Sequence, residues 1–185
     1  SAFEALNVSG LDSLRYGKLL NDCCKEANGV VYEYSRFDAD FEGMGTTLVG
    51  GIVTRRKAFI VNVGDSRAYH ITRIKQISRD HSYVQELVDA GVISKLEAQN
   101  HPKKNIITRA LGIDKTVESD FFEVSLKRGD GILLCSDGLT NMVSDEEIFK
   151  AFSENKDPHD VCKSLMQLAL SRSARDNVSV VLVKI

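Results

Sequence analysis

The sequence predicts an α+β fold in which an antiparallel β-sandwich is flanked by helices on its outer faces. Three features carry this prediction. A long amphipathic helical pattern comes first, segments rich in β-branched residues follow with short turns between them, and two further helical patterns precede a last strand. The 185 residues, 43% of them hydrophobic, suffice for one substantial core. Because no repeat or domain boundary is visible, we expect one domain over residues 1–185.

The first elements are a helix over residues 11–34 and a pair of strands over residues 46–53 and 57–63. The helix is predicted because apolar residues recur with a period close to 3.6. The strands are rich in β-branched residues, and the polar turn 54–56 between them indicates a hairpin. A second tight turn, Gly64-Asp65-Ser66, leads into a strand over residues 67–72. Because such short turns join the three strands, we expect all three to be antiparallel neighbours.

The later elements are predicted mainly from their boundaries. Two short helices in the excursion 82–112 begin with capping-box patterns at Ser82 and Ser94, each with Gln or Glu three residues on. The remaining expected elements are strands at 121–126 and 131–135, a helix capped by Ser144, a helix starting at Asp157-Pro158 and a final strand at 178–183.

Composition excludes several functional classes. A net charge of −2 with interspersed signs gives no electrostatic footprint for nucleic acid. No apolar run approaches the roughly 20 residues that span a bilayer, so we expect no membrane association in this segment. The four cysteines form no C-x-x-C pattern and are interpreted as reduced thiols. This favours a cytoplasmic location and argues against a thiolate zinc site.

Three carboxylates lie where predicted strands begin or end: Asp65, Asp137 and Asp176. Each has an ordinary structural explanation, because Asp is common in Gly-Asp-Ser and Asp-Gly turns and as a local hydrogen-bonding residue before a strand. Taken singly, turn chemistry is the better interpretation of each. Taken together, the three form an ordered set along the chain.

Six motifs resemble the type 2C metal-dependent protein serine/threonine phosphatase family, in its bacterial style, in both order and spacing. They are Gly43-Met44-Gly45-Thr46-Thr47, Val63-Gly64-Asp65-Ser66-Arg67-Ala68-Tyr69, Asp80-His81-Ser82, Thr108-Arg109-Ala110-Leu111-Gly112, Ser136-Asp137-Gly138-Leu139 and Arg175-Asp176-Asn177-Val178-Ser179. The resemblance covers essentially the whole chain. It implies a four-layer α-β-β-α sandwich, which agrees with the pattern reading above, and it marks residues 82–112 as the mobile flap beside a catalytic cleft.

The resemblance also implies a chemistry. Members of the family hold two or three Mg²⁺ or Mn²⁺ ions at one end of the sandwich and activate a water that attacks phosphorus in line. By motif, Asp137 and Asp176 are similar to ligands of the first metal, and Asp65 is similar to a ligand of the third. The implied reaction is hydrolysis of phosphoserine and phosphothreonine on proteins, the substrates of a serine/threonine kinase, by a monomeric enzyme.

The family pattern includes an upstream segment with a phosphate-binding arginine, an acid histidine and an Asp-Gly-Met-Gly-Gly-His stretch. The chain begins after this segment, so we expect an N-terminally truncated domain that lacks its first strands, and we assign no catalytic residue here. Glu42 is not taken as a ligand, because Glu42-Gly43-Met44-Gly45 is followed by Thr46-Thr47. A catalytically silent, partner-binding relative is therefore the alternative function.

Other polar residues receive structural interpretations. His81 is expected to be a hydrogen-bonding residue near a helix start, and Ser136 to bond locally, because no His-Asp pair accompanies it. Arg67 is expected to pair with a carboxylate near Asp65. Arg109 is a modest candidate for substrate contact from the flap.

Overall fold

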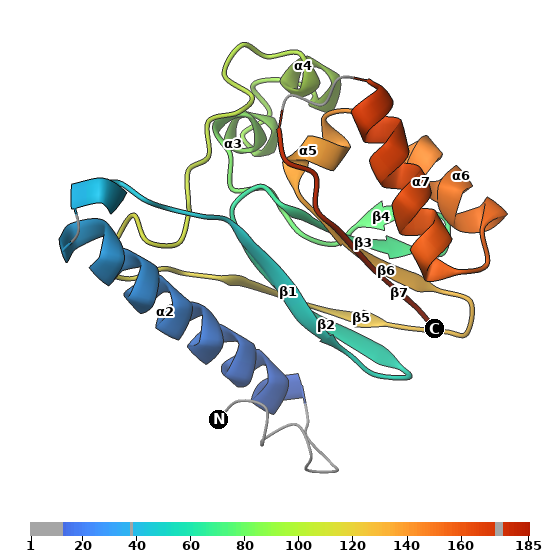
Figure 1. The fold of residues 1–185 in the computed structure, drawn as a ribbon, viewed down its shortest axis with the longest axis horizontal. Helices are drawn as coiled ribbons and strands as arrows, with labels where there is room; N and C mark the ends of the chain where they lie inside the picture. Colours follow the sequence, from blue (N-terminus) through green and yellow to red (C-terminus); the bar gives the residue numbers. More distant parts are fainter. Residues whose placement is uncertain (1–12, 38, 173–175) are drawn as a thin grey trace.

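The computed structural model describes residues 13–37, 39–172 and 176–185. These described residues form seven strands and seven helical segments, in the order shown in Figure 1. The helical segments are α2 (Ser13–Phe37), the 3-10 helix η1 (Ala39–Phe41), α3 (Tyr83–Asp89), α4 (Lys95–Gln99), α5 (Asp137–Thr140), α6 (Asp145–Glu154) and α7 (Pro158–Ser171). The strands are β1 (Leu48–Val53), β2 (Lys57–Val63), β3 (Arg67–Ile71), β4 (Lys75–Gln76), β5 (Asp120–Ser125), β6 (Gly131–Cys135) and β7 (Val180–Lys184).

The strands form two antiparallel sheets. The first has the order β1-β2-β5 and the second the order β4-β3-β6-β7. Central strand β2 pairs with β1 through Leu48 opposite Val63, and β6 pairs with β7 through Leu133 opposite Leu182. The prediction of an antiparallel sandwich is therefore confirmed.

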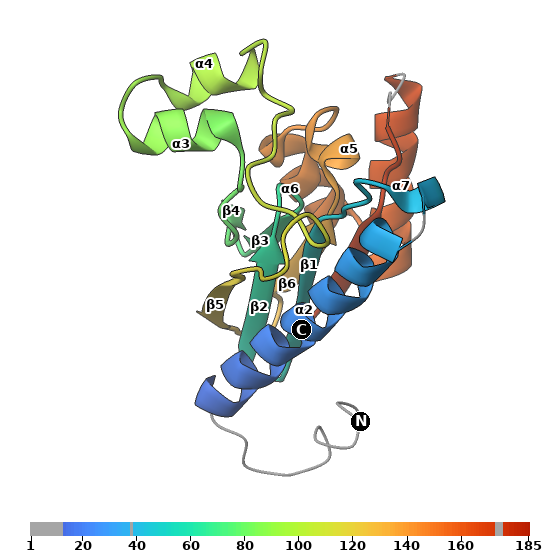
Figure 2. The same cartoon turned by 90° about the vertical axis from the view of Figure 1, so that its left-hand side faces the viewer.

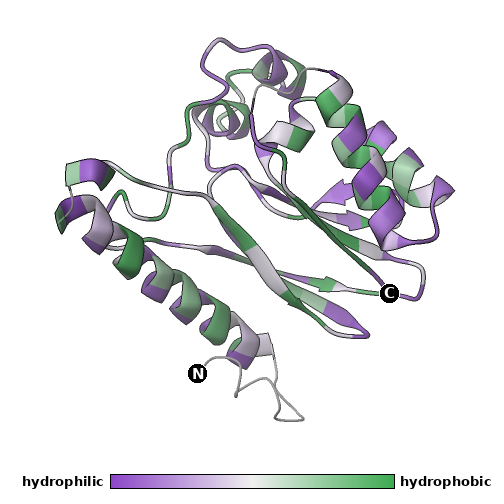
Figure 3. Cartoon of the chain, in the orientation of Figure 1, coloured by the Kyte–Doolittle hydropathy of each residue, from purple (hydrophilic) through white to green (hydrophobic). Residues whose placement is uncertain are grey.

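Helices cover the outer face of each sheet, which gives four layers (Figure 1). Helix α2 lies against the first sheet, where Tyr16 stacks on Phe59 with ring centroids 4.6 Å apart. Helices α5, α6 and α7 cover the second sheet and bury a cluster that includes Tyr69, Leu133 and Leu165. In Figure 3, hydrophobic residues run along the strands in the middle of the molecule and alternate with hydrophilic ones along α2. The amphipathic patterns in the sequence thus mark real layer contacts.

The two central strands are apolar on both faces because each is packed on both sides. In β2, Ala58 and Ile60 point between the sheets while Phe59 stacks with α2. In β6, Ile132 points between the sheets while Leu133 packs under the helices. A strand that is covered twice needs apolar residues without alternation, as the continuous run at 131–135 indicated.

The expectation that β2 and β3 are neighbours is wrong, because they belong to different sheets. The turn Gly64-Asp65-Ser66 carries the chain from one sheet to the other across the end of the sandwich. Its backbone bonds go to His81 rather than to a partner strand, with His81 N donating to Gly64 O at 2.9 Å. A tight turn normally joins two strands of one sheet into a hairpin, whereas this turn joins strands of two different sheets.

The element boundaries follow their predicted caps closely. Ser94 and Ser144 each form a complete capping box, and Asp157 caps α7 with Pro158 at the first position. Ser82 caps α3 by accepting from Gln85 N, without the reciprocal bond of a full box. Helix α2 runs to Phe37, three residues beyond its expected end, and positions 11 and 12 lie outside the described residues. The last strand begins at Val180, two residues later than expected.

Helices α3 and α4 project beyond the end of the sheets at which β2 passes into β3 (Figure 2). The two short helices predicted within residues 82–112 are thus present as α3 and α4. The cysteines Cys23, Cys24, Cys135 and Cys162 are free thiols, as expected. Within the described part of the chain, no helix has the length and apolarity needed to cross a membrane.

Candidate metal centre

Asp65 lies in the corner between the two sheets, directly after the buried strand β2. Gly64 has a φ of +104°, and a Cβ there would lie 2.4 Å from the Thr47 side chain, so only glycine fits. On the other side, Ser66 Oγ and Thr47 Oγ1 are hydrogen-bonded at 2.8 Å. These contacts hold the turn against the start of β1 and fix the position of the Asp65 backbone.

Asp137 follows β6 and is the first residue of α5. The segment that carries Asp176 passes directly beside it. Ser136 Oγ donates to Asn177 O at 3.2 Å and accepts from Ser179 N at 3.0 Å. A Cβ on Gly138 would lie 2.4 Å from Asn177 O, so the close approach of the two segments depends on this glycine. Ser136 is thus a structural hydrogen-bonding residue, as expected, but its partners lie in the distant segment 177–179 rather than locally. The backbones next to Asp137 and Asp176 are therefore neighbours.

The electrostatics of Asp65 link it to Asp137. Burial and then repulsion from Asp137 and Asp80 raise the pKa of the Asp65 carboxyl to about 6. Asp137 is half-buried, whereas Asp176 is exposed and bonds to Asn177 N. The structure therefore brings Asp65 and Asp137 within electrostatic range, and it places the backbone segment that carries Asp176 beside the start of α5.

A second carboxylate near this corner is already neutralised. Arg67 Nε donates to both oxygens of Asp80 at 3.1 and 3.0 Å, and Arg67 Nη2 donates to Asp80 Oδ2 at 2.7 Å. Gln76 Nε2 adds a bond to Asp80 Oδ1 at 2.7 Å. This bidentate pair confirms the expected carboxylate partner of Arg67, and the ion pair of Arg67 is with Asp80 rather than with Asp65.

His81 acts as a structural connector. Its Nδ1 accepts from Gly64 N at 3.0 Å, which places the ring proton on Nε2, 3.3 Å from Asp120 Oδ2. Burial lowers the pKa of the His81 imidazole, so the ring is neutral at pH 7. Beside the ring, Arg109 Nη1 donates to Asp120 Oδ1 at 3.1 Å and to Glu118 O at 3.0 Å. The structural interpretation of His81 is supported by these bonds.

The donor chemistry at this end of the sandwich fits a hard divalent cation. The carboxylates of Asp65 and Asp137 lie within electrostatic range of each other, and a bound cation would offset both the burial and the repulsion that raise the pKa of Asp65. Among the described residues, no three His, Cys, Asp or Glu side chains stand close enough together to hold a metal ion by themselves. Any ion bound here would therefore keep several waters, as Mg²⁺ and Mn²⁺ commonly do.

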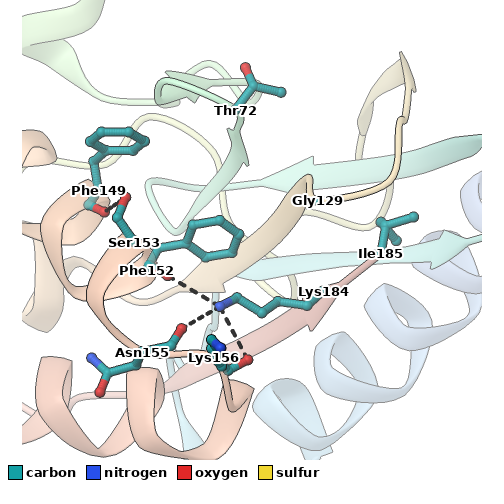
Figure 4. Close-up of a pocket in the computed structure, with 9 residues that line it drawn as sticks. All are labelled: Thr72, Gly129, Phe149, Phe152, Ser153, Asn155, Lys156, Lys184 and Ile185. Carbon is teal, nitrogen blue, oxygen red and sulfur yellow. Dashed lines mark hydrogen bonds between the residues drawn. The ribbon is translucent and has the colours of Figure 1, made fainter.

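A separate pocket lies at the opposite end of the second sheet, between α6 and the end of β7 (Figure 4). The Lys184 ammonium group donates to the carbonyl oxygens of Phe152, Asn155 and Lys156, and it lies 4.3 Å from the centroid of the Phe152 ring. These bonds satisfy carbonyls at the C-terminal end of α6. The site has a structural purpose and contains none of the three predicted metal ligands among its lining residues.

Sequence reasoning missed the contacts that surround the aspartates. The Thr47 to Ser66 bond and the Asp120 partner of His81 join residues far apart in the chain. No short motif contains both members of either pair. Asp80 lies in the motif Asp80-His81-Ser82, but the motif does not indicate that Asp80 is the carboxylate that pairs with Arg67.

Comparison with known proteins defines the class. The protein phosphatase 2C family model matches residues 5–159. Given also the four-layer sandwich, the chain belongs to the protein phosphatase 2C family.

Individual relatives agree with this assignment. The chain is 41% identical over 167 residues to the serine/threonine phosphatase Stp of Listeria monocytogenes, covering 89% of this chain and 66% of that protein. It is 39% identical over 148 residues to the protein phosphatase PhpP of Streptococcus pneumoniae, covering 79% of this chain and 60% of that protein. The chain therefore spans less than two thirds of the length of these relatives.

Solved structures give the same picture. The crystal structure of serine/threonine phosphatase Stp1 from Staphylococcus aureus matches with a TM-score of 0.91 at 40% identity, covering 97% of this chain and 71% of that one. The catalytic domain of the serine/threonine protein phosphatase PstP, crystallised in complex with two manganese ions, matches with a TM-score of 0.83 at 34% identity. That match covers 98% of this chain and 76% of the PstP chain. The predicted resemblance is confirmed.

Proposed function

We propose that the chain forms the larger part of a metal-dependent protein phosphatase that hydrolyses phosphoserine and phosphothreonine, with Asp65, Asp137 and Asp176 among its metal ligands. The observation that carries the proposal is the convergence of Asp65 and Asp137, with the Asp176 segment beside Asp137, at one end of a phosphatase-family sandwich. The relatives named above are called phosphatases, and none of those names describes a silent binding module.

Each aspartate has a distinct part in this proposal. Asp137, half-buried at the start of α5, is the central ligand because both other carboxylate-bearing segments lie beside it. Asp176 closes the site from the rim, and Asp65 approaches from the corner between the sheets. Bound Mg²⁺ or Mn²⁺ would neutralise the negative charge of the carboxylates and the phosphate. It would also lower the pKa of a bound water, so that the resulting hydroxide can attack phosphorus. In the family pattern described above, the phosphate-binding arginine and the acid histidine stand in an upstream segment, so no residue of this chain is proposed for these two roles.

Substrates in this proposal are phosphorylated proteins, the products of a serine/threonine kinase. We further propose a monomeric enzyme that works in the cytoplasm, in keeping with the free thiols and the mixed surface charge. No nucleic acid is expected to bind.

Hydrolysis of p-nitrophenyl phosphate tests the proposal, with Mn²⁺ present and then chelated. The complete gene product should turn over only with the metal, and Asp137→Asn should lower kcat/KM by at least about 100-fold. Asp22→Asn, an exposed aspartate on α2, is the matched control and should behave as the wild type. Metal-independent turnover, or full activity of Asp137→Asn, would contradict the proposal.

A further inference from the structure

A pocket of about 640 Å³ lies between the link after α2 and the loop that joins the flap to β5. We call it the flank pocket. Its lining combines backbone at two glycines, several apolar side chains and three charged ones: Gly43, Gly45, Ile107, Thr108, Arg109, Ala110, Ile113, Asp114, Thr116, Val117 and Glu118. Nothing in the proposed metal chemistry uses this space.

One wall of the flank pocket is tied to the residue before Asp65. Thr108 N donates to His81 O at 2.8 Å, and Tyr83 N donates to Ile106 O at 2.9 Å, so residues 106–108 run beside His81 as a short bridge. His81 is in turn bonded to Gly64 through both its backbone N and its ring Nδ1. The position of this wall is therefore set by the corner that carries Asp65.

The other wall is tied to the residue after Asp65. Thr46 and Leu111 exchange backbone bonds of 3.1 and 2.8 Å, which join the link after α2 to the lining loop. The next residue, Thr47, is bonded to Ser66. Both walls are thus connected through hydrogen bonds to the two neighbours of Asp65, Gly64 and Ser66, so the pocket lies next to the corner that carries Asp65.

The lining chemistry suits a peptide that carries one apolar and one basic side chain. Ile107 is 39% and Ile113 is 54% exposed, although both are large apolar residues. Arg109 is paired with Asp120, which leaves Asp114 and Glu118 as exposed carboxylates with no ion pair among the described residues. The pocket therefore offers an apolar surface with a net negative rim.

We propose that the flank pocket binds the polypeptide next to the phosphorylated residue of a substrate, taking an apolar side chain adjacent to Lys or Arg. This inference rests on the proposed phosphatase function and adds to it a substrate class. Ile107 and Ile113 contact the apolar side chain, and Asp114 with Glu118 attracts the basic one. Arg109 is a positioning residue that holds the wall through its bonds to Asp120 and to the Glu118 carbonyl.

Phosphopeptide kinetics on the complete gene product with Mn²⁺ test this inference. Two phosphothreonine peptides are compared, one with Leu-Arg on both sides of the phosphothreonine and one with Ser-Ser, with p-nitrophenyl phosphate as the small substrate. Wild type should prefer the Leu-Arg peptide. In Ile107→Glu, the ratio of kcat/KM for that peptide to kcat/KM for p-nitrophenyl phosphate should fall about tenfold or more. Asp114→Lys should shift the preference away from the Leu-Arg peptide.

Met166→Glu is the matched control, because Met166 on α7 is also 39% exposed and lies away from the pocket. Its ratio should equal that of wild type. If the ratio of kcat/KM for the Leu-Arg peptide to kcat/KM for p-nitrophenyl phosphate is the same in Ile107→Glu and wild type, and p-nitrophenyl phosphate is still hydrolysed, the inference about the flank pocket is overturned and the proposed function is not. Absence of any metal-dependent turnover in wild type would overturn the proposed function and this inference with it. A lower thermal midpoint of Ile107→Glu, with equal losses on all three substrates, would show that another part of the gene product fills the pocket and would also overturn the inference.

Discussion

Asp65 is placed where its charge is costly unless a cation accompanies it. Two neighbours restrain its backbone: Gly64 has a positive φ, and the Ser66 hydroxyl is hydrogen-bonded to Thr47. Burial and the adjacent Asp137 raise its pKa to about 6, and the nearby Arg67 is already engaged by Asp80. A residue held in such an environment is typical of a functional site rather than of a simple turn.

Asp65→Asn should stabilise the metal-free protein at pH 7 by about 1 kcal/mol, a figure discounted for solvent screening of this partly exposed group. The folded state retains the Asp65 proton between the ordinary pKa of 3.8 and about 6, so wild-type stability falls as pH rises through that window. The advantage of the variant should therefore be absent near pH 3.5 and complete above pH 6. Denaturant unfolding in the presence of a chelator measures it, and an unchanged or lower stability at pH 7 would refute this picture of Asp65.

His81 should matter for stability more than for chemistry. His81→Ala leaves the buried Gly64 N–H without its acceptor and should cost about 2 kcal/mol of unfolding free energy. His81→Gln offers both an oxygen acceptor and an amide donor and should recover part of that loss. Equilibrium unfolding at pH 7.5 compares the three proteins. An alanine variant as stable as wild type would mean that the connection from His81 to the corner is not needed.

At the scale of elements, the junction of β6 with α5 is the critical piece. Strand β6 pairs with β3 on one side and with β7 on the other, and α5 begins with Asp137 shortly after β6 ends at Cys135. The segment 176–179 is fastened to this junction through Ser136 and passes within contact of Gly138. Backbone packing thus brings together two segments that carry predicted metal ligands and lie far apart in the sequence.

Gly138→Ala should weaken Mn²⁺ binding by tenfold or more, because a Cβ 2.4 Å from Asn177 O must push the Asp176 segment away. Calorimetric titration with Mn²⁺ measures the change. Gly29→Ala is the matched control, since no atom lies within 4 Å of its added Cβ and helix α2 should gain about 0.5–1 kcal/mol. Equal Mn²⁺ affinity in Gly138→Ala and Gly29→Ala would count against the proposed role of this junction.

Helix starts and buried strands were the most predictable elements, because caps and continuous apolar runs act locally. Ser94, Ser144 and Asp157 each cap the helix that the sequence predicted. The placement of β2 and β3 in different sheets was not predictable from turn length, because a three-residue turn can close a hairpin or turn a corner between sheets. The deciding contacts, from the turn to His81 and Thr47, are set by the tertiary structure.

At the scale of the whole molecule, the sandwich creates the candidate site at one end and a purely structural clamp at the other. The corner with Asp65, the start of α5 and the base of the flap gather at the first end (Figures 1 and 2). Lys184 fastens β7 to the end of α6 at the second (Figure 4). The sequence predicts that the three aspartates lie at strand ends. Which strand ends are neighbours depends on how the two sheets pack against each other, and this cannot be predicted from local patterns.

Metal binding should stabilise the whole fold. At an Mn²⁺ concentration 100 times Kd, linkage raises the free energy of unfolding by about 2.7 kcal/mol if the unfolded chain does not bind. Thermal unfolding with and without chelator should show a higher midpoint with Mn²⁺ in wild type and almost none of this gain in Asp137→Asn. A gain of the same size in Asp137→Asn would place the stabilising ion elsewhere.

The most direct measurement is the anomalous scattering of manganese in crystals of the complete gene product grown with Mn²⁺. We expect anomalous peaks within coordination distance of Asp137 and Asp176, and a further peak at Asp65 if a third ion binds. These peaks should disappear in Asp137→Asn crystals grown in the same way. Manganese peaks that lie only away from these three carboxylates would contradict the assignment of the metal centre, and with it the proposed mechanism.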